Sequence, residues 1–159
     1  MQFFRYRENH VHGDDALPLQ AYHLPSRGNF VFPCHWHPEF EFLLVNDGRL
    51  LLQRGQRTIT VQAGEAAFLG PAELHTGLTD GSGCRCQAVV FSGTFLESSA
   101  ADGGQTRWLQ PLMTGELALP DRIGPAAPFG QRMVDCLAEL VELAERRGVR
   151  LVELRAHRD

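Results

Sequence analysis

Between Leu19 and Phe91 the chain alternates short apolar stretches with Gly, Pro, Asn and Asp. Turn residues recur about every eight to twelve positions, a spacing typical of an antiparallel sandwich or barrel. The pattern predicts strands over residues 20–24, 29–32, 39–45, 49–54, 57–62, 66–69, 75–79 and 85–91. Asn46-Asp47-Gly48 predicts one hairpin, and Gly55-Gln56, with Gly first, predicts a second hairpin with a type II′ turn.

Helical periodicity begins only after the last of these strands. We expect short helices over 94–98 and 106–113, and a long amphipathic helix over 129–147 whose apolar residues recur every three or four positions. A further helical stretch is predicted over 149–156. The expected organisation is a mainly β barrel with an N-terminal arm over residues 1–120, followed by a helical appendage over 121–159.

Composition fits one globular domain and narrows the possible partners. The chain has 159 residues, 43% of them hydrophobic, which is enough for a sizeable core. All 15 basic residues are Arg, and the 19 acidic residues leave a net charge of −4. Binding of nucleic acid by bulk charge is therefore not expected. With neither a signal peptide nor a long apolar run, we expect a cytoplasmic protein without a membrane partner.

The polar chemistry concentrates in the segment His35-Trp-His-Pro-Glu-Phe-Glu41. Side chains alternate along a strand, so His35, His37 and Glu41 are predicted to share one face with Glu39, which we place at the barrel mouth. Two imidazoles and a carboxylate can supply three ligands to a divalent metal, and a fourth must come from another strand. His75, which opens the predicted strand after Gly64 and Pro71, is the candidate.

The spacing G-x6-H-x-H-x3-E-x6-G from Gly28, followed by G-x6-P-x3-H from Gly64, resembles the two cupin motifs over residues 28–79. The resemblance implies a cupin double-stranded β-helix, a jelly-roll barrel, with His35, His37, Glu41 and His75 converging inside it. Three His and one Glu suit Zn, Fe, Ni or Mn. An imidazole-rich pocket without metal could equally bind a polar ligand through hydrogen bonds.

A narrower resemblance includes the segment from His35 to Gly48, the segment from Arg57 to Pro71 and the long C-terminal helix. Together they resemble the N-terminal sensor domain of AraC-type transcription regulators. That likeness implies a barrel that binds a small effector and helices that form a homodimer. We expect the effector to contact His35, His37, Glu41 and His75, with Leu43 and Phe68 as apolar lining. DNA would be bound only through a helix-turn-helix part that is missing here, so we expect a fragment or a stand-alone relative.

Two other readings of the sequence stay open. One is a small metal-dependent cupin enzyme, a dioxygenase or isomerase. The sequence spacing predicts no further base, nucleophile or Arg clamp on the inward face of the strand that carries His35 and His37. The other is a dimerisation module with an empty barrel. A second His-x-His, at His10 and His12, is interpreted as part of a solvated N-terminal arm. That such an arm covers the barrel mouth is a hypothesis.

Overall fold

The computed structural model describes residues 6–97, 102–146 and 152–153. Its elements are mainly strands, with helices toward the C-terminal end, as predicted. In chain order they are β1 (Leu19–Pro25), β2 (Phe30–His35), β3 (Phe40–Arg54), β4 (Arg57–Gln62), β5 (Ala66–Leu69), β6 (His75–Leu78), β7 (Cys84–Phe91), the 3₁₀-helix η2 (Gly93–Leu96), the π-helix η3 (Gln105–Leu109), α1 (Gln110–Thr114), α2 (Gly130–Arg146) and β8 (Val152–Glu153).

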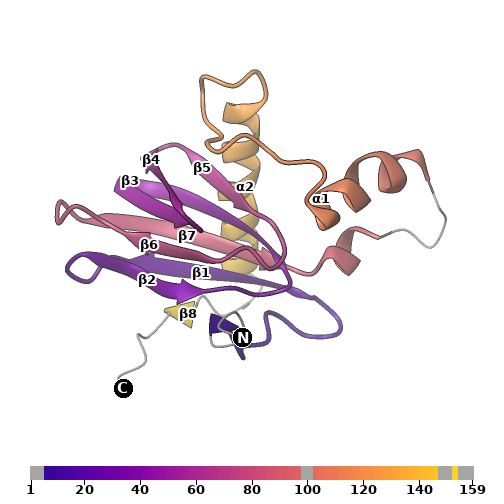
Figure 1. Cartoon of the computed structure of the whole chain (residues 1–159), viewed down its shortest axis with the longest axis horizontal. Coiled ribbons are helices and arrows are strands. Elements are labelled where there is room, and N and C mark those ends of the chain that lie inside the picture. The colour runs from indigo at the N-terminus through magenta and orange to yellow at the C-terminus, as the bar shows by residue number, and fades with distance from the viewer. Residues whose placement is uncertain (1–5, 98–101, 147–151, 154–159) are drawn as a thin grey trace.

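The long strand β3 joins the two layers of a curled antiparallel sheet (Figure 1). Its first half pairs with β5 and β7, and its second half pairs with β4 and β6. β2 extends the second layer beside β6, and β1 extends the first beside β7. The fold is therefore the mainly β jelly roll that the sequence predicted, with the two layers facing each other across one core.

The predicted hairpin at Asn46-Asp47-Gly48 is wrong. The chain does not reverse here but continues as part of β3, with a bulge between Val45 and Asp47 in the pairing with β7. Gly48 has a φ of +72°, and an added Cβ would lie 2.2 Å from the carbonyl oxygen of Gly83. Residues tolerant of positive φ therefore serve here to bend one strand from the first layer into the second, not to reverse the chain.

The bulge also reverses which side of β3 faces the core. Before it, Leu43 and Val45 point into the space between the layers; after it, Leu50 and Leu52 do so. A one-residue shift has this effect because strand side chains have a period of two. The hairpin at Gly55 is confirmed, since Arg54 pairs with Arg57 and Gly55 has a φ of +56°.

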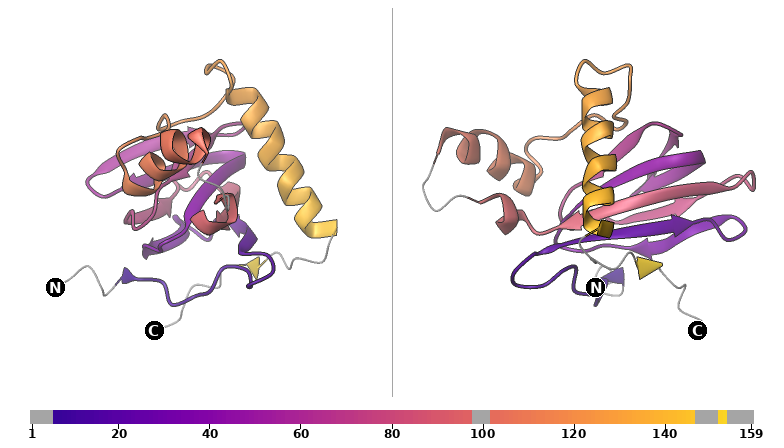
Figure 2. Two further views of the ribbon diagram at one scale, coloured as in Figure 1. Left: turned by 90° about the vertical axis from the view of Figure 1, so that its right-hand side faces the viewer. Right: turned by 180° about the vertical axis from the view of Figure 1, so that it is seen from behind.

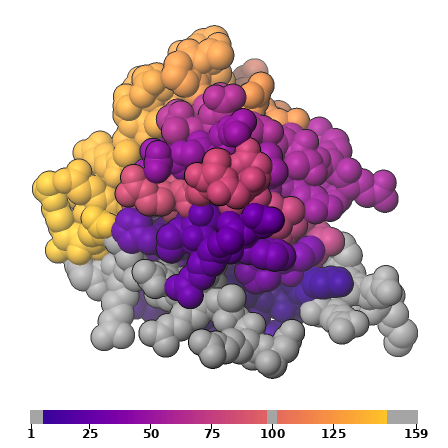
Figure 3. Space-filling view, turned by 90° about the vertical axis from the view of Figure 1, so that its left-hand side faces the viewer, coloured from indigo at the N-terminus to yellow at the C-terminus, as the bar shows by residue number. Residues whose placement is uncertain are grey.

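The outer face of the first layer is covered by α2. Phe40 and Leu44 of β3 pack in a second apolar cluster with Val134, Leu137 and Val141 of the helix. Figure 2 shows α2 running along one side of the strands, and in the space-filling view of Figure 3 it forms one edge of the molecule, in yellow and orange. The helix predicted over 129–147 is confirmed and acts as the cover that this apolar strand face requires.

The C-terminal prediction is partly wrong. Val152 and Glu153 form β8, which pairs in parallel with Tyr22 and His23 of β1, where a helix over 149–156 was expected. The other residues of that predicted helix lie outside the described part of the chain. Pairing with an open sheet edge can override a local helical pattern because it satisfies backbone groups of both strands. No helix in the described residues is long and apolar enough to cross a membrane.

Candidate functional site

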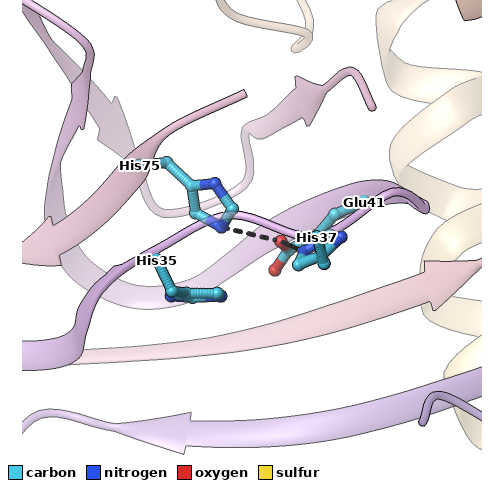
Figure 4. Close-up of side chains that lie close together, drawn as sticks. All are labelled: His35, His37, Glu41 and His75. Atoms are coloured by element: carbon cyan, nitrogen blue, oxygen red, sulfur yellow. Dashed lines mark hydrogen bonds and ion pairs between the residues drawn. The ribbon is translucent and has the colours of Figure 1, made fainter. Parts of the chain in front are cut away.

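Four side chains from separate elements meet between the two layers of the sheet (Figure 4). His35 is the last residue of β2, His37 lies in the connection to β3, Glu41 is in β3, and His75 is the first residue of β6. One ligand atom from each lies within 4.8 Å of the ligand atoms of all the others. The structure thus brings together the four residues that the sequence singled out.

The carboxylate of Glu41 lies between two imidazoles. Its Oε2 atom is 3.0 Å from Nε2 of His37 and 3.1 Å from Nε2 of His75. Burial raises the pKa of Glu41, but its hydrogen bond with His37 and the charges of the two imidazoles outweigh burial and hold that pKa well below its usual range. The carboxyl group is therefore ionised and available as an anionic ligand.

Backbone carbonyls fix the orientation of two histidine rings. Nδ1 of His35 lies 2.8 Å from the Pro33 carbonyl oxygen, and Nδ1 of His75 lies 2.7 Å from that of Glu73. A carbonyl only accepts hydrogen bonds, so Nδ1 is the donor in each neutral ring and Nε2 keeps its lone pair. Histidine ligands of metals are commonly held in this way.

The pKa values of the two neighbouring histidines move in opposite directions. Burial, followed by the charge of His75, lowers the pKa of His35. Burial also lowers the pKa of His37, but its hydrogen bond with Glu41 and the nearby carboxylates of Glu39 and Glu8 raise it by more. His35 is thus favoured in its neutral form, whereas His37 is readily protonated. A metal cation could replace the proton between His37 and Glu41, because imidazoles bind metal in their deprotonated form.

The donor set fits a divalent metal ion. Two ligands about 2.1 Å from one ion are about 3.0 Å apart when they bind at a right angle, and the two distances around Glu41, 3.0 and 3.1 Å, are close to this value. Nε2 of His75 is buried and has no hydrogen-bond partner of acceptable geometry. Such an ion would supply a Lewis-acidic centre for a donor atom of a bound ligand.

Supporting contacts hold the site from outside. Glu39 lies with its Oε2 atom 3.5 Å from Nδ1 of His37, so it contacts one of the four clustered residues. Arg54 donates to both carboxylate oxygens of Glu73, at 2.6 and 2.9 Å, and Glu73 precedes His75 by two residues. The ion pair between Arg54 and Glu73 had no sequence signal, because it depends on pairing between β3 and β6.

The interpretation of His12 as part of a solvated arm is wrong. Its side chain is only 3% exposed, and its Nδ1 atom lies 2.6 Å from the hydroxyl of Tyr22 in β1. The arm docks on the barrel, where the backbone of Trp36 pairs with Tyr6 and Glu8. The available signal was the aromatic content of the arm, which favours docking over full solvation.

The apolar lining was predicted less well than the polar cluster. Leu43 is fully buried in the core between the layers but does not line the cavity beside the histidines. Phe68 lies on the opposite side of the sheet, in the cluster under α2, so its placement in the pocket is wrong. Phe68 pairs with Phe42, and paired residues share a face, so both point outward while Leu69, opposite Glu41, points inward.

Comparison with known proteins identifies the domain type. The family described as "AraC-like ligand binding domain" matches residues 20–153. An uncharacterized HTH-type transcriptional regulator from Bacillus subtilis, YdeC, is 29% identical over 105 residues, which are 64% of this chain and 35% of the regulator. The chain thus spans about a third of the length of that relative.

Two solved structures illustrate the structural similarity. An RmlC-like cupin from Shewanella frigidimarina aligns with a TM-score of 0.42 and 16% identity, over 46% of this chain and 65% of that chain. A Cupin 2 conserved barrel domain protein from Salinispora arenicola aligns with a TM-score of 0.37 and 20% identity, over 49% of this chain and 61% of that chain.

The family match spans most of the described strands and α2, and it includes the segments that carry His35, His37, Glu41 and His75. The chain therefore belongs to the AraC-like ligand-binding domain family.

Proposed function

We propose that this domain senses a small molecule for an AraC-type transcription regulator, and that it does so at a metal centre formed by His35, His37, Glu41 and His75. The observation that carries the proposal is the convergence of three histidines, two of them buried, on one ionised and buried carboxylate inside the barrel. Buried polar groups without full hydrogen bonding are costly unless a ligand or ion satisfies them.

The proposed sensing mechanism is a shift between two arrangements of the domain. A ligand changes such an equilibrium only if its affinity for the two arrangements differs. The barrel, residues 1–120 with the arm, would bind the effector, and the helical appendage, 121–159, would report the change to a partner. DNA recognition would belong to a separate helix-turn-helix part of a cytoplasmic regulator.

The proposed partner of α2 is a second copy of this chain. Next to the buried stripe, the helix carries an apolar groove lined by Phe129, Arg132, Met133, Cys136, Leu137 and Leu140. Phe129, directly before α2, is 43% exposed, and Leu143 in α2 is 48% exposed. A helix that is apolar beyond the face it packs against its own barrel is suited to pairing with a symmetry mate.

A ligand screen tests the sensing function. The chain would be loaded with Zn²⁺ and melted in the presence of monosaccharides, hydroxy acids and aromatic acids. We expect at least one class to raise the melting temperature, because a molecule that binds only the folded state stabilises it. The variant His35→Ala should lose this shift, whereas His10→Ala, an exposed arm histidine, should keep it.

The same samples distinguish a sensor from an enzyme. Conversion of a compound in the panel by the Zn²⁺-loaded chain would contradict the sensor and support a metal-dependent cupin enzyme. So would consumption of dioxygen by a parallel sample loaded with Fe²⁺, which, unlike Zn²⁺, can exchange electrons with dioxygen. Melting temperatures that stay unchanged across the panel would also contradict the proposed sensing function.

A further inference from the structure

The N-terminal arm carries a second carboxylate to the edge of the histidine cluster. Oε2 of Glu8 lies 3.5 Å from Nε2 of His35 and 3.4 Å from Nε2 of His12. Glu8, His12 and His37 also form a second group whose ligand atoms lie within 4.8 Å of one another, and this group shares His37 with the group of four. Glu8 is therefore adjacent to two of the four barrel residues, although it lies outside the segment that carries the cupin motifs.

The arm is fixed at this position by contacts on both sides of Glu8. The backbone N–H of Glu8 donates to the Trp36 carbonyl at 2.9 Å, and the N–H of Trp36 donates to the Tyr6 carbonyl at 2.9 Å. The guanidinium of Arg7 lies 5.7 Å from the centroid of the Trp36 ring. These contacts leave the Glu8 side chain directed at the cluster.

His12 presents an unsatisfied nitrogen to the same space. Its Nδ1 atom is engaged with the Tyr22 hydroxyl, while Nε2 is buried and has no hydrogen-bond partner of acceptable geometry. The 3.5 Å distance from Glu8 Oε2 to His35 Nε2 lies within the range, about 3.0 to 4.2 Å, that separates two ligands of one ion with more than four ligands. The 3.4 Å contact between Glu8 and His12 holds the Glu8 carboxylate beside His35.

The cavity between the arm and the barrel is small. Its volume is about 10 Å³, and its walls include Glu8, His12, His35, His37 and Glu41. That volume corresponds to about one water molecule or ion, whereas sites for organic ligands measure about 300–1,000 Å³. In this arrangement the site accommodates an ion, and the arm has to move before an organic molecule can enter.

We propose that Glu8 is a further ligand of the metal centre, supplied by the arm and positioned by His12, so that metal binding fixes the arm across the barrel mouth. The inference rests on the proposed metal centre and adds a residue that neither cupin motif contains. Loss of the Glu8 contact would leave the arm held only by its contacts with Trp36 and Tyr22 and would make the site easier to open.

Hydrogen exchange tests whether metal fixes the arm. The whole chain would be stripped with a chelator, and exchange of the amides of residues 6–18 would be measured by mass spectrometry with and without Zn²⁺. We expect Zn²⁺ to slow this exchange in the wild-type chain. Glu8→Gln should abolish the slowing and weaken Zn²⁺ binding by about 10-fold or more. Asp15→Asn, which changes an exposed carboxylate of the same arm, should behave as wild type.

The variant His75→Ala distinguishes one shared ion from a separate ion held by the arm, because it removes a barrel ligand and leaves Glu8, His12 and His37 in place. If all the ligands hold one ion, this variant should also lose the Zn²⁺-dependent slowing. Persistent slowing in His75→Ala would overturn the proposal in favour of an independent arm site. Zn²⁺ binding with unchanged arm exchange in the wild-type chain would overturn Glu8 as a ligand but leave the barrel centre intact. No Zn²⁺ binding at all would overturn both.

Discussion

His75, at the start of β6, lies with its Nε2 atom 3.1 Å from the carboxylate of Glu41 in β3. These residues belong to different motifs and different layers of the sheet, so their contact depends on the bend in β3. Features that preserve the bend and the position of β6 should therefore control the site as well as stability.

Gly77 leaves room for the ring that supports two of the histidines. An added Cβ at Gly77 would lie 2.4 Å from the ring of Phe32, whose centroid is 5.8 Å from those of His35 and His75. We expect Gly77→Ala to reduce the free energy of unfolding by about 1–3 kcal/mol and to weaken Zn²⁺ binding. Gly103→Ala, where no atom lies within 4 Å, is the control. Denaturant unfolding and Zn²⁺ titration provide the measurements; equal stability of the two variants would contradict this prediction.

Gly48 should be more sensitive to substitution than another glycine with positive φ. Gly64 has a φ of +83° with open space around it, so Gly64→Ala should cost only the backbone strain, about 1–2 kcal/mol. Gly48→Ala adds a collision with the Gly83 carbonyl and should cost about 1–3 kcal/mol more. Urea unfolding of both variants tests the difference. Equal losses of unfolding free energy in the two variants would contradict a steric collision at position 48.

Arg54 should support His75 through Glu73. Its side chain is 11% exposed, and it also donates to Asp121 at 3.1 Å. We expect Arg54→Ala to lower the free energy of unfolding by about 1.5–3 kcal/mol, the scale for hydrogen bonds to charged groups, and to weaken Zn²⁺ binding. Arg57 also pairs with Asp121 but is 67% exposed, so Arg57→Ala should cost at most about 1 kcal/mol. If the Arg54 variant bound Zn²⁺ as tightly as wild type, the supporting role would be excluded.

Leu143 tests the proposed dimer. In sedimentation equilibrium we expect the wild-type chain to dimerise, and Leu143→Glu to raise the dissociation constant about 10-fold or more, equivalent to about 1.4 kcal/mol. Ala138→Glu introduces the same charge at an exposed position on another side of α2 and should leave association unchanged. A monomeric wild-type chain at high micromolar concentration would reject the dimer.

Glu41 was predictable from local alternation, whereas the three histidines, which lie outside β3, were predictable from the spacing of the two motifs. Glu41 faces inward and Phe40 outward, as expected for neighbours on a strand. Phe68 was misplaced because its direction depends on its register with Phe42, a long-range pairing that no local pattern reports. The docking of His12 likewise depends on tertiary contacts with Tyr22.

The bend at Gly48 and the strand at Val152 could not be predicted either, because both depend on contacts with strands that are distant in the sequence. Asn46-Asp47-Gly48 permits positive φ, but the local sequence does not distinguish a hairpin from a bulge. The neighbouring strands determine that a bulge forms, because β3 pairs with partner strands both before and after this point. Val152 forms a strand because the edge of β1 lies beside it.

The most direct test of the central claim is the Zn²⁺ stoichiometry and affinity of the chelator-stripped chain, measured beside His75→Ala. A metal centre built from His35, His37, Glu41 and His75 predicts about one tightly bound ion per wild-type chain, with affinity at least about 100-fold lower in the variant. Equal binding by the two chains, or no tight binding by the wild-type chain, would contradict the account.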